Sequence, residues 1–216
     1  MSLRILQFQL FRHDISTRMP FKYGIATMTH LPHVFLRIEA SVDGRAQSGI
    51  SADHLPPKWF TKDPERDPFY EIDDMLNVIE NAGSLAKDIE AETVFNFWRD
   101  LYGRQDAWAK EQGIPSLLAH FGTSLVERAL IDAFCRHLQL PFHQALAENA
   151  LGIDFSTVRP DLAGTQPNDW LPTEPLGQVT ARHTVGLADP IYESEISDQA
   201  RIGDGLPESL EACIGF

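Results

Sequence analysis

Side chains that could perform chemistry gather in two short stretches of this 216-residue chain. The first stretch, residues 19–29, contains Phe21, Lys22 and Tyr23. The ammonium group of Lys22 could pair with a carboxylate or a hydroxyl group of a small molecule. The alternative is structural: the two aromatic rings pack this loop onto the neighbouring strands, and the lysine is solvated. Both interpretations are open at the level of sequence, although loops carry function more often than core elements do.

The second stretch, residues 50–60, combines polar and aromatic side chains next to two consecutive prolines. Asp53 and His54 could present a carboxylate and an imidazole on a backbone stiffened by Pro56 and Pro57, an arrangement suited to a hydroxy acid. Lys58 and Trp59 follow directly. The alternative is a solvated surface loop in which the indole is tucked down. Both stretches thus contain candidate binding side chains, and the structural alternative stays open for each.

Other potential sites in the sequence are weaker. His30 and His33 are separated by a proline, which prevents the one-face helical geometry of an H-E-x-x-H metal site. Asp132 lies among apolar residues at helical spacing, and we expect it to pair with Arg128 or Arg136. The sequence contains no G-x-S-x-G, no phosphate-binding glycine loop and no C-x-x-C pair. No nucleophile motif therefore supports a hydrolase.

The composition excludes some classes of protein. The formal net charge is −13, from 18 Lys and Arg against 31 Asp and Glu, without a basic block. A nucleic-acid-binding surface needs clustered positive charge, so we expect no nucleic-acid partner. No apolar stretch reaches the roughly 18 residues of a membrane span, and the N-terminus lacks a signal-peptide core. With only Cys135 and Cys213, far apart in the sequence, we expect a cytoplasmic protein without disulfides and without a membrane.

Apolar periodicity predicts an α+β domain over residues 1–150. Alternation predicts an antiparallel three-stranded meander, with Asp43–Gly44 as a tight turn. Its strands span residues 3–11, 34–41 and 45–50, and loops are expected at 18–32 and 51–68. Helical spacing predicts helices over 72–81 and 92–102, stopped by Gly83 and Gly103, and a third from a capping box at Ser124 to Pro141.

The sequence pattern of residues 151–216 differs from that of residues 1–150. Residues 152–178 are rich in Pro, Gly, Asp and Thr and predict a linker. Thr184–Ala188 is a short apolar run that predicts a buried strand, and residues 204–210 predict the start of a helix with Pro207 in its first turn. One strand and one helix cannot form a sheet alone, so we interpret them as the first βα unit of an incomplete TIM-type barrel.

Three stretches in this order resemble the N-terminal half of the enolase superfamily, in its mandelate racemase and muconate lactonizing enzyme branch. Residues 35–40 with the Asp43–Gly44 turn and Gly49 are similar to the meander of the capping domain. Residues 129–133, continuing through Pro141 to Leu146, are similar to the last capping helix. Residues 184–190 are similar to the first barrel strand. The sequence departs from the family after Leu146, where Ala147–Ala150 replaces the usual L-G-G.

The resemblance implies a metal-dependent isomerase or lyase that removes the proton next to a carboxylate, of the racemase, cycloisomerase or acid-sugar dehydratase type. Mg²⁺ would stabilise the resulting enediolate, and a Lys or His would act as the base. The metal ligands and the base are expected beyond Phe216, so this chain alone is expected to be inactive and to contain no catalytic residue. The alternative is a truncated, non-catalytic binding or assembly module that keeps only the capping fold.

The resemblance also assigns a role to the two polar loops, because capping loops contact the distal part of the substrate in this family. The predicted substrate-binding residues are therefore Phe21, Lys22, Tyr23, Asp53, His54 and Trp59. The expected partners are a small carboxylate or acid-sugar substrate and further copies of the chain in a homo-oligomer.

Overall fold

A computed structural model describes residues 1–180, 182 and 184–216, and the chain has an α+β fold. Four antiparallel strands form one sheet in the order β3-β2-β1-β4. Their bounds are β1 (Leu3–Tyr23), β2 (Ala26–Val42), β3 (Arg45–His54) and β4 (Glu90–Ala91). The predicted three-stranded meander is confirmed, and the short strand β4 adds a fourth member beside the start of β1.

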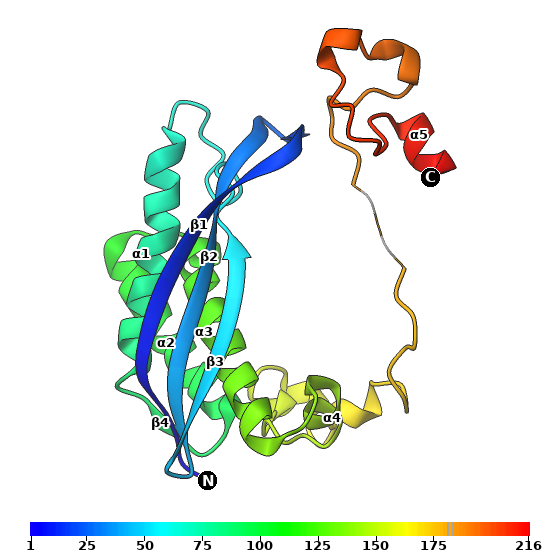
Figure 1. The fold of residues 1–216 in the computed structure, drawn as a ribbon. Helices are drawn as coiled ribbons and strands as arrows, with labels where there is room; N and C mark the ends of the chain where they lie inside the picture. Colours follow the sequence, from blue (N-terminus) through cyan, green and yellow to red (C-terminus); the bar gives the residue numbers. More distant parts are fainter. Residues whose placement is uncertain (181, 183) are drawn as a thin grey trace.

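Helices cover one face of the sheet and leave the other open (Figure 1). The helices are α1 (Pro68–Ala86), α2 (Val94–Gln112), α3 (Ser116–Leu138), α4 (Phe142–Ala147) and α5 (Leu210–Gly215). Short 3-10 turns lie between α4 and α5, at η1 (Phe155–Thr157), η2 (Pro160–Leu162), η3 (Pro167–Asp169), η4 (Glu193–Glu195) and η5 (Asp198–Ala200). The core lies between the sheet and helices α1–α3, where strand and helix side chains are fully buried.

Two glycines permit the close approach of these layers. A Cβ atom on Gly49 of β3 would lie 2.1 Å from the carbonyl oxygen of Ala129 in α3. A Cβ atom on Gly122 of α3 would lie 2.1 Å from the carbonyl oxygen of Val78 in α1. Because both obstacles are backbone atoms, no side-chain rearrangement makes room for a methyl group. Helix α3 therefore packs closely against β3 on one side and against α1 on the other.

The hairpin between β1 and β2 is longer than the sequence predicts. Residues 18–32 were expected to form a loop, but strand pairing continues to Tyr23 opposite Ala26. Gly24, with φ +51°, lies in the turn. A register shift between Ser16 and Phe21 accommodates the proline in this part of β1. The local Pro and Gly residues thus shape the ribbon without ending it.

Two of the predicted helix ends and one predicted helix start are wrong. Gly83 and Gly103 lie inside α1 and α2, because an isolated glycine costs a helix only about 1 kcal/mol. Ser124 lies in the middle of α3, which begins eight residues earlier after Pro115. The capping-box pattern at Ser124 therefore arises by chance inside a helix that tertiary packing extends.

The segment from residue 184 onward corrects the predicted barrel strand. Residues 184–188 form no strand within the described part of the chain, and Leu187 and Ala188 lie in a turn. Isolated strand backbone is unstable without a partner for its amide and carbonyl groups. The predicted helix exists, but α5 begins at Leu210 with Ser209 as its N-cap rather than near residue 204. The division at residue 150 into a capping domain and a barrel segment stays a prediction.

As for membranes, none of the helices in the described residues combines the length and the apolar character that a crossing segment needs.

Candidate functional site

Aromatic side chains meet at the tip of the β1–β2 hairpin. Phe21 and Tyr23 point to the same side of β1 because they are two residues apart, and their rings stack with centroids 5.9 Å apart. The Tyr23 hydroxyl donates a hydrogen bond of 2.7 Å to the carbonyl oxygen of Pro57. Burial, with a smaller contribution from the nearby carboxylate of Glu71, raises the pKa of Tyr23 above its usual value. The tyrosine thus stays a neutral donor that ties the hairpin to the loop after β3.

Trp59 extends this aromatic group from the second predicted loop. Its ring centroid lies 6.3 Å from that of Tyr23, and the residue is 58% exposed. We call Phe21, Tyr23 and Trp59 the aromatic cluster. Its rings are partly open to solvent, so the cluster presents an apolar surface rather than a sealed core. The tucked-down indole of the alternative interpretation is not what the structure has.

Lys58 holds the second loop in place from inside. Its side chain is only 9% exposed, and its ammonium group lies 2.6 Å from Oε1 of Glu71, whose side chain is 5% exposed. The ammonium group also donates to the carbonyl oxygen of Asp63, at 2.8 Å, and to that of Arg66. The backbone of Lys58 is left-handed, with φ +64°, and its amide donates to the other oxygen of Glu71. This buried ion pair therefore fixes the backbone immediately before Trp59.

Lys22 and its neighbours contact residues 184–216, which we call the C-terminal segment. The Lys22 side chain is exposed, and its carbonyl oxygen accepts a hydrogen bond of 2.9 Å from the amide of Leu187. Arg18 makes two hydrogen bonds of 2.6 Å to the carboxylate of Asp204. The carbonyl oxygens of Leu206 and Pro207 accept two more from Arg18. The Arg18 pair lowers the pKa of Asp204 to about 2. The hairpin tip is thus connected to residues almost two hundred positions away.

Asp53 and His54 lie apart from the aromatic cluster, and their side chains diverge. Both belong to β3, so their side chains leave opposite faces of the sheet. On the helix side, Asp53 pairs with Arg128 of α3 at 2.8 Å. On the open side, the ring of His54 lies 4.4 Å from that of His33. Burial and the two neighbouring histidines His13 and His54 lower the pKa of His33, with Asp53 opposing them.

Strand register separates these two residues from the hairpin tip. His54 pairs with His33, whereas Phe21 pairs with Met28, five positions further along β2. At about 3.3 Å per residue, the separation is about 17 Å. The structure therefore brings Phe21, Tyr23 and Trp59 together. Asp53 and His54 lie outside this aromatic cluster.

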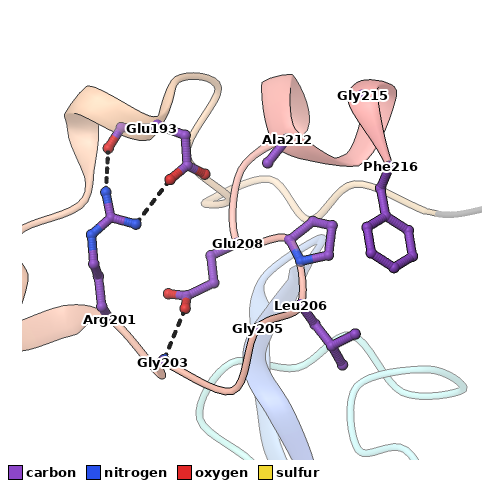
Figure 2. Close-up of a pocket in the computed structure, with 10 residues that line it drawn as sticks. Glu193, Arg201, Gly203, Gly205, Leu206, Glu208, Ala212, Gly215 and Phe216 are labelled. Atoms are coloured by element: carbon purple, nitrogen blue, oxygen red, sulfur yellow. Dashed lines mark hydrogen bonds and ion pairs between the residues drawn. The ribbon is translucent and has the colours of Figure 1, made fainter.

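A cavity of about 240 Å³ lies between the hairpin tip and the C-terminal segment. Of the predicted site residues, Phe21 lines this cavity. Other lining residues include Arg18, Val185, Ser209 and Cys213. A second, wider groove of about 680 Å³ belongs to the C-terminal segment alone (Figure 2). There the ion pair of Glu193 and Arg201, at 2.8 Å, forms one wall, while Leu206 and Phe216 supply apolar side chains.

The donor set of the described residues does not match a magnesium site. No group of three or more His, Cys, Asp or Glu side chains in that part of the chain could hold a metal ion. Asp53, the acidic member of the predicted site, is already paired with Arg128. We therefore derive no chemical step through a metal from these residues.

Sequence reasoning missed Arg18 and underestimated Lys58. Arg18 lies in a stretch without any local motif, and its partner Asp204 is remote in the sequence. The sequence shows a lysine at position 58 but not that it is buried, because its partner Glu71 belongs to the next helix. Neither contact leaves a pattern at short spacing, so no local feature of the sequence could have indicated them.

Comparison with known proteins finds similarity at the level of solved structures. No protein-family model matches the sequence, and no curated protein matches it either. An enolase from Bradyrhizobium, complexed with magnesium and mandelic acid, matches with 15% identity and a TM-score of 0.46, over 68% of this chain and 35% of that chain. The muconate lactonizing enzyme from Pseudomonas fluorescens matches with 21% identity and a TM-score of 0.45, over 66% and 33%.

A third match is the L-Ala-D/L-Glu epimerase from Bacillus subtilis, with 20% identity and a TM-score of 0.41, over 66% of this chain and 34% of that chain. This chain spans about a third of the length of these matched proteins. The α+β class, with a meander followed by helices, is confirmed by the strands and helices of the structure itself.

Proposed function

We propose that this chain is the capping part of an enolase-superfamily enzyme that removes the proton next to a carboxylate, and that the aromatic cluster contacts the substrate. One observation carries the proposal. Two loops that the sequence resemblance assigns to substrate contact lie far apart in the chain, yet they meet through the Tyr23–Pro57 hydrogen bond and the ring contact with Trp59.

Within this proposal, only some of the predicted site residues contact the substrate. The rings of Phe21, Tyr23 and Trp59 bind an apolar or aromatic part of the substrate, since aromatic faces bury large area at low entropic cost. The exposed side chain of Lys22 leaves the opposite side of β1, because Lys22 lies between Phe21 and Tyr23, so the rings alone make this contact. Asp53 and His54, which the sequence also suggested, have no part in this contact because of their position on β3.

The proposal assigns the reacting groups to another part of the protein. Within the proposal, these residues bind and orient the substrate and exclude water from it. Whether racemisation, elimination or cycloisomerisation follows depends on groups outside this site.

A binding experiment on the 216-residue chain tests the contact. Mandelate is a suitable probe because it combines an aromatic ring with a carboxylate. In ¹H–¹⁵N spectra the indole N–H signal of Trp59, assigned with Trp59→Phe, should shift saturably with mandelate concentration. Lys22→Met, on the opposite side of β1, should leave the binding within about twofold, whereas Phe21→Ala should weaken it several-fold.

Trp170 provides the internal control because it is similarly exposed, at 64% against 58%, and lies outside the aromatic cluster. Its indole signal should not move. Absence of any Trp59 shift, or an equal shift at Trp170, would contradict the assignment of the aromatic cluster as a substrate surface.

A second candidate function is a non-catalytic binding or assembly module. Exposed apolar side chains at the C-terminal end favour it: Leu187 is 72% exposed, and Ile214 and Phe216 are more exposed still. The intact mass of the protein from its native source separates the two candidates. A mass well above 24.3 kDa supports the capping part of a larger enzyme, whereas 24.3 kDa favours the module.

A further inference from the structure

Three histidines form one row across the side of the sheet that helices α1–α3 leave open (Figure 1). Strand register places His33 of β2 between His13 of β1 and His54 of β3. The row faces away from the helices because the alternate residues of β2, such as Val34, are buried against them. Imidazole is a common ligand of transition-metal ions, and the proposed function uses none of these rings, so the row is a candidate metal site.

Backbone pairing brings two of the three histidines close together. The amide of Leu55 donates a hydrogen bond of 2.9 Å to the carbonyl oxygen of Pro32, so these residues form a hydrogen-bonded pair. Such pairs alternate with non-hydrogen-bonded pairs along an antiparallel ladder, so the adjacent pair of His33 and His54 is of the second kind. Opposite Cα atoms are then about 4.5 Å apart. The backbone groups of His33 point instead toward β1, and its pair with His13 has the wider spacing of about 5.5 Å.

The positions of the rings agree with this pairing. The ring centroids of His33 and His54 lie 4.4 Å apart, and the ring planes are inclined by 58°. Two imidazoles that bind one tetrahedral metal ion, with metal–nitrogen distances of about 2.0–2.1 Å, have centroids about 5 Å apart. The side chain of His54 is exposed, so a small rotation brings one nitrogen of each ring to a common point. The pair is thus close to the geometry of two metal ligands.

The ring of His33 is held in position and has an unsatisfied nitrogen. It makes a T-shaped contact with Phe35, with centroids 4.6 Å apart, which restricts its rotation. Within the described part of the chain, Nδ1 of His33 is buried and has no hydrogen-bond partner. A buried polar atom without a partner costs free energy, and a metal ion bound to it removes this cost. We propose that His33 and His54 together bind one divalent transition-metal ion, through one imidazole nitrogen each.

The ligands define the class of metal. Two imidazoles make an open site, since the described residues contain no group of three or more ligands that could enclose an ion, and water completes the coordination. Imidazole nitrogen suits Zn²⁺, Ni²⁺ and Cu²⁺, whereas Mg²⁺ prefers oxygen ligands. The formal net charge of −13 also attracts cations to the protein. We therefore expect Zn²⁺ to bind and Cu²⁺ to bind more tightly, as it does at most nitrogen sites.

A metal ion at this place joins β2 to the last residue of β3. His54 ends β3, and the chain continues through two prolines to Lys58 and Trp59. The ion therefore fixes the start of the loop that carries Trp59, and it stabilises the folded state because the unfolded chain does not hold the two rings together. The inference does not depend on the proposed substrate contact, because it uses other side chains and another class of metal.

Calorimetric titration of the full chain with Zn²⁺ tests the site. His33→Gln and His54→Gln should each weaken Zn²⁺ binding at least about tenfold, because each variant removes one of two ligands that act together. His13→Gln should change the affinity by less than about threefold, because His13 belongs to the same row but to the wider pair. An excess of Mg²⁺ should not compete with Zn²⁺.

Spectra of the unmodified chain locate the ion without relying on the folding of a variant. In ¹H–¹³C spectra of the imidazole rings, the signals of His33 and His54 should shift together and saturably with Zn²⁺. His143, an exposed histidine on α4, is the matched control: its signals should not move, and His143→Gln should leave the affinity unchanged. Absence of a saturable shift at His33 and His54, or an equal shift at His143, overturns the proposal. An affinity that survives either Gln variant of the pair, or that His13→Gln lowers equally, also overturns it.

Discussion

The buried ion pair of Lys58 and Glu71 provides the sharpest test of how the aromatic cluster is held. Replacing Lys58 with Met leaves the carboxylate of Glu71, only 5% exposed, without its cation. It also removes the donor for the carbonyl oxygens of Asp63 and Arg66, so the loop loses three contacts at once. Removing one partner of a buried pair costs about 3–5 kcal/mol, a large share of the about 5–15 kcal/mol that stabilises a domain.

Urea unfolding followed by circular dichroism measures this cost, and Lys62→Met is the matched control. Lys62 belongs to the same loop but is exposed, so its loss should stay below about 1 kcal/mol. Glu71→Gln keeps an acceptor for the Lys58 amide, and the double variant Lys58→Met/Glu71→Gln should lose less than the sum of the single variants. A loss for Lys58→Met no larger than that of the control would refute the conclusion that this pair is desolvated and fixes the loop.

Two further predictions concern helix α3. Burial raises the pKa of Glu127 from 4.5 to about 6, so the folded state binds its proton more tightly than the unfolded state does. The folded state therefore loses stability as the pH rises from 4.5 to about 6. Glu127→Gln should be more stable than the parent protein by up to about 2 kcal/mol near pH 7, but not near pH 4. Urea unfolding at the two pH values measures this difference. Gly49→Ala should destabilise the protein by at least about 1–3 kcal/mol, because the added methyl group meets the backbone of Ala129. Gly103→Ala, with open space around it in α2, should stabilise the protein by about 0.5–1 kcal/mol. Equal shifts of the melting temperature for the two variants would contradict the close packing of β3 and α3.

Local patterns predicted the centre of the sheet well and its ends poorly. Alternation along β2 and β3 is strong because one face is buried against helices, so residues 34–41 and 45–50 were placed correctly. The hairpin tip lacks such a core. Its strands pair with each other beyond the helices, and Pro20 and Gly24 resemble loop residues although they belong to a ribbon. Backbone pairing without burial leaves little hydrophobic pattern to read.

The candidate site was predicted in part for the same reason. The sequence predicts Asp53 and His54 as neighbours in one loop, but β3 continues through His54, so the two side chains leave opposite faces of the sheet. The pairing of Asp132 with Arg136 was predictable, because the two residues are four positions apart on a helix. The pairing of Arg18 with Asp204 was not, since it depends on the path of the chain through the intervening residues.

The hairpin tip makes three separate contacts with other parts of the chain. Within six positions, Arg18 contacts Asp204, the Lys22 carbonyl contacts Leu187, and Tyr23 contacts Pro57. The first two contacts connect the tip to the C-terminal segment, and the third connects it to the loop that Lys58 fixes. A change in the position of the C-terminal segment would therefore reach Tyr23 through the backbone of Lys22, next to the substrate surface that we propose. Because different residues make the side-chain contacts, Arg18→Ala and Tyr23→Phe release one connection each, and their separate effects on mandelate binding distinguish positioning of the tip from direct contact with the ligand.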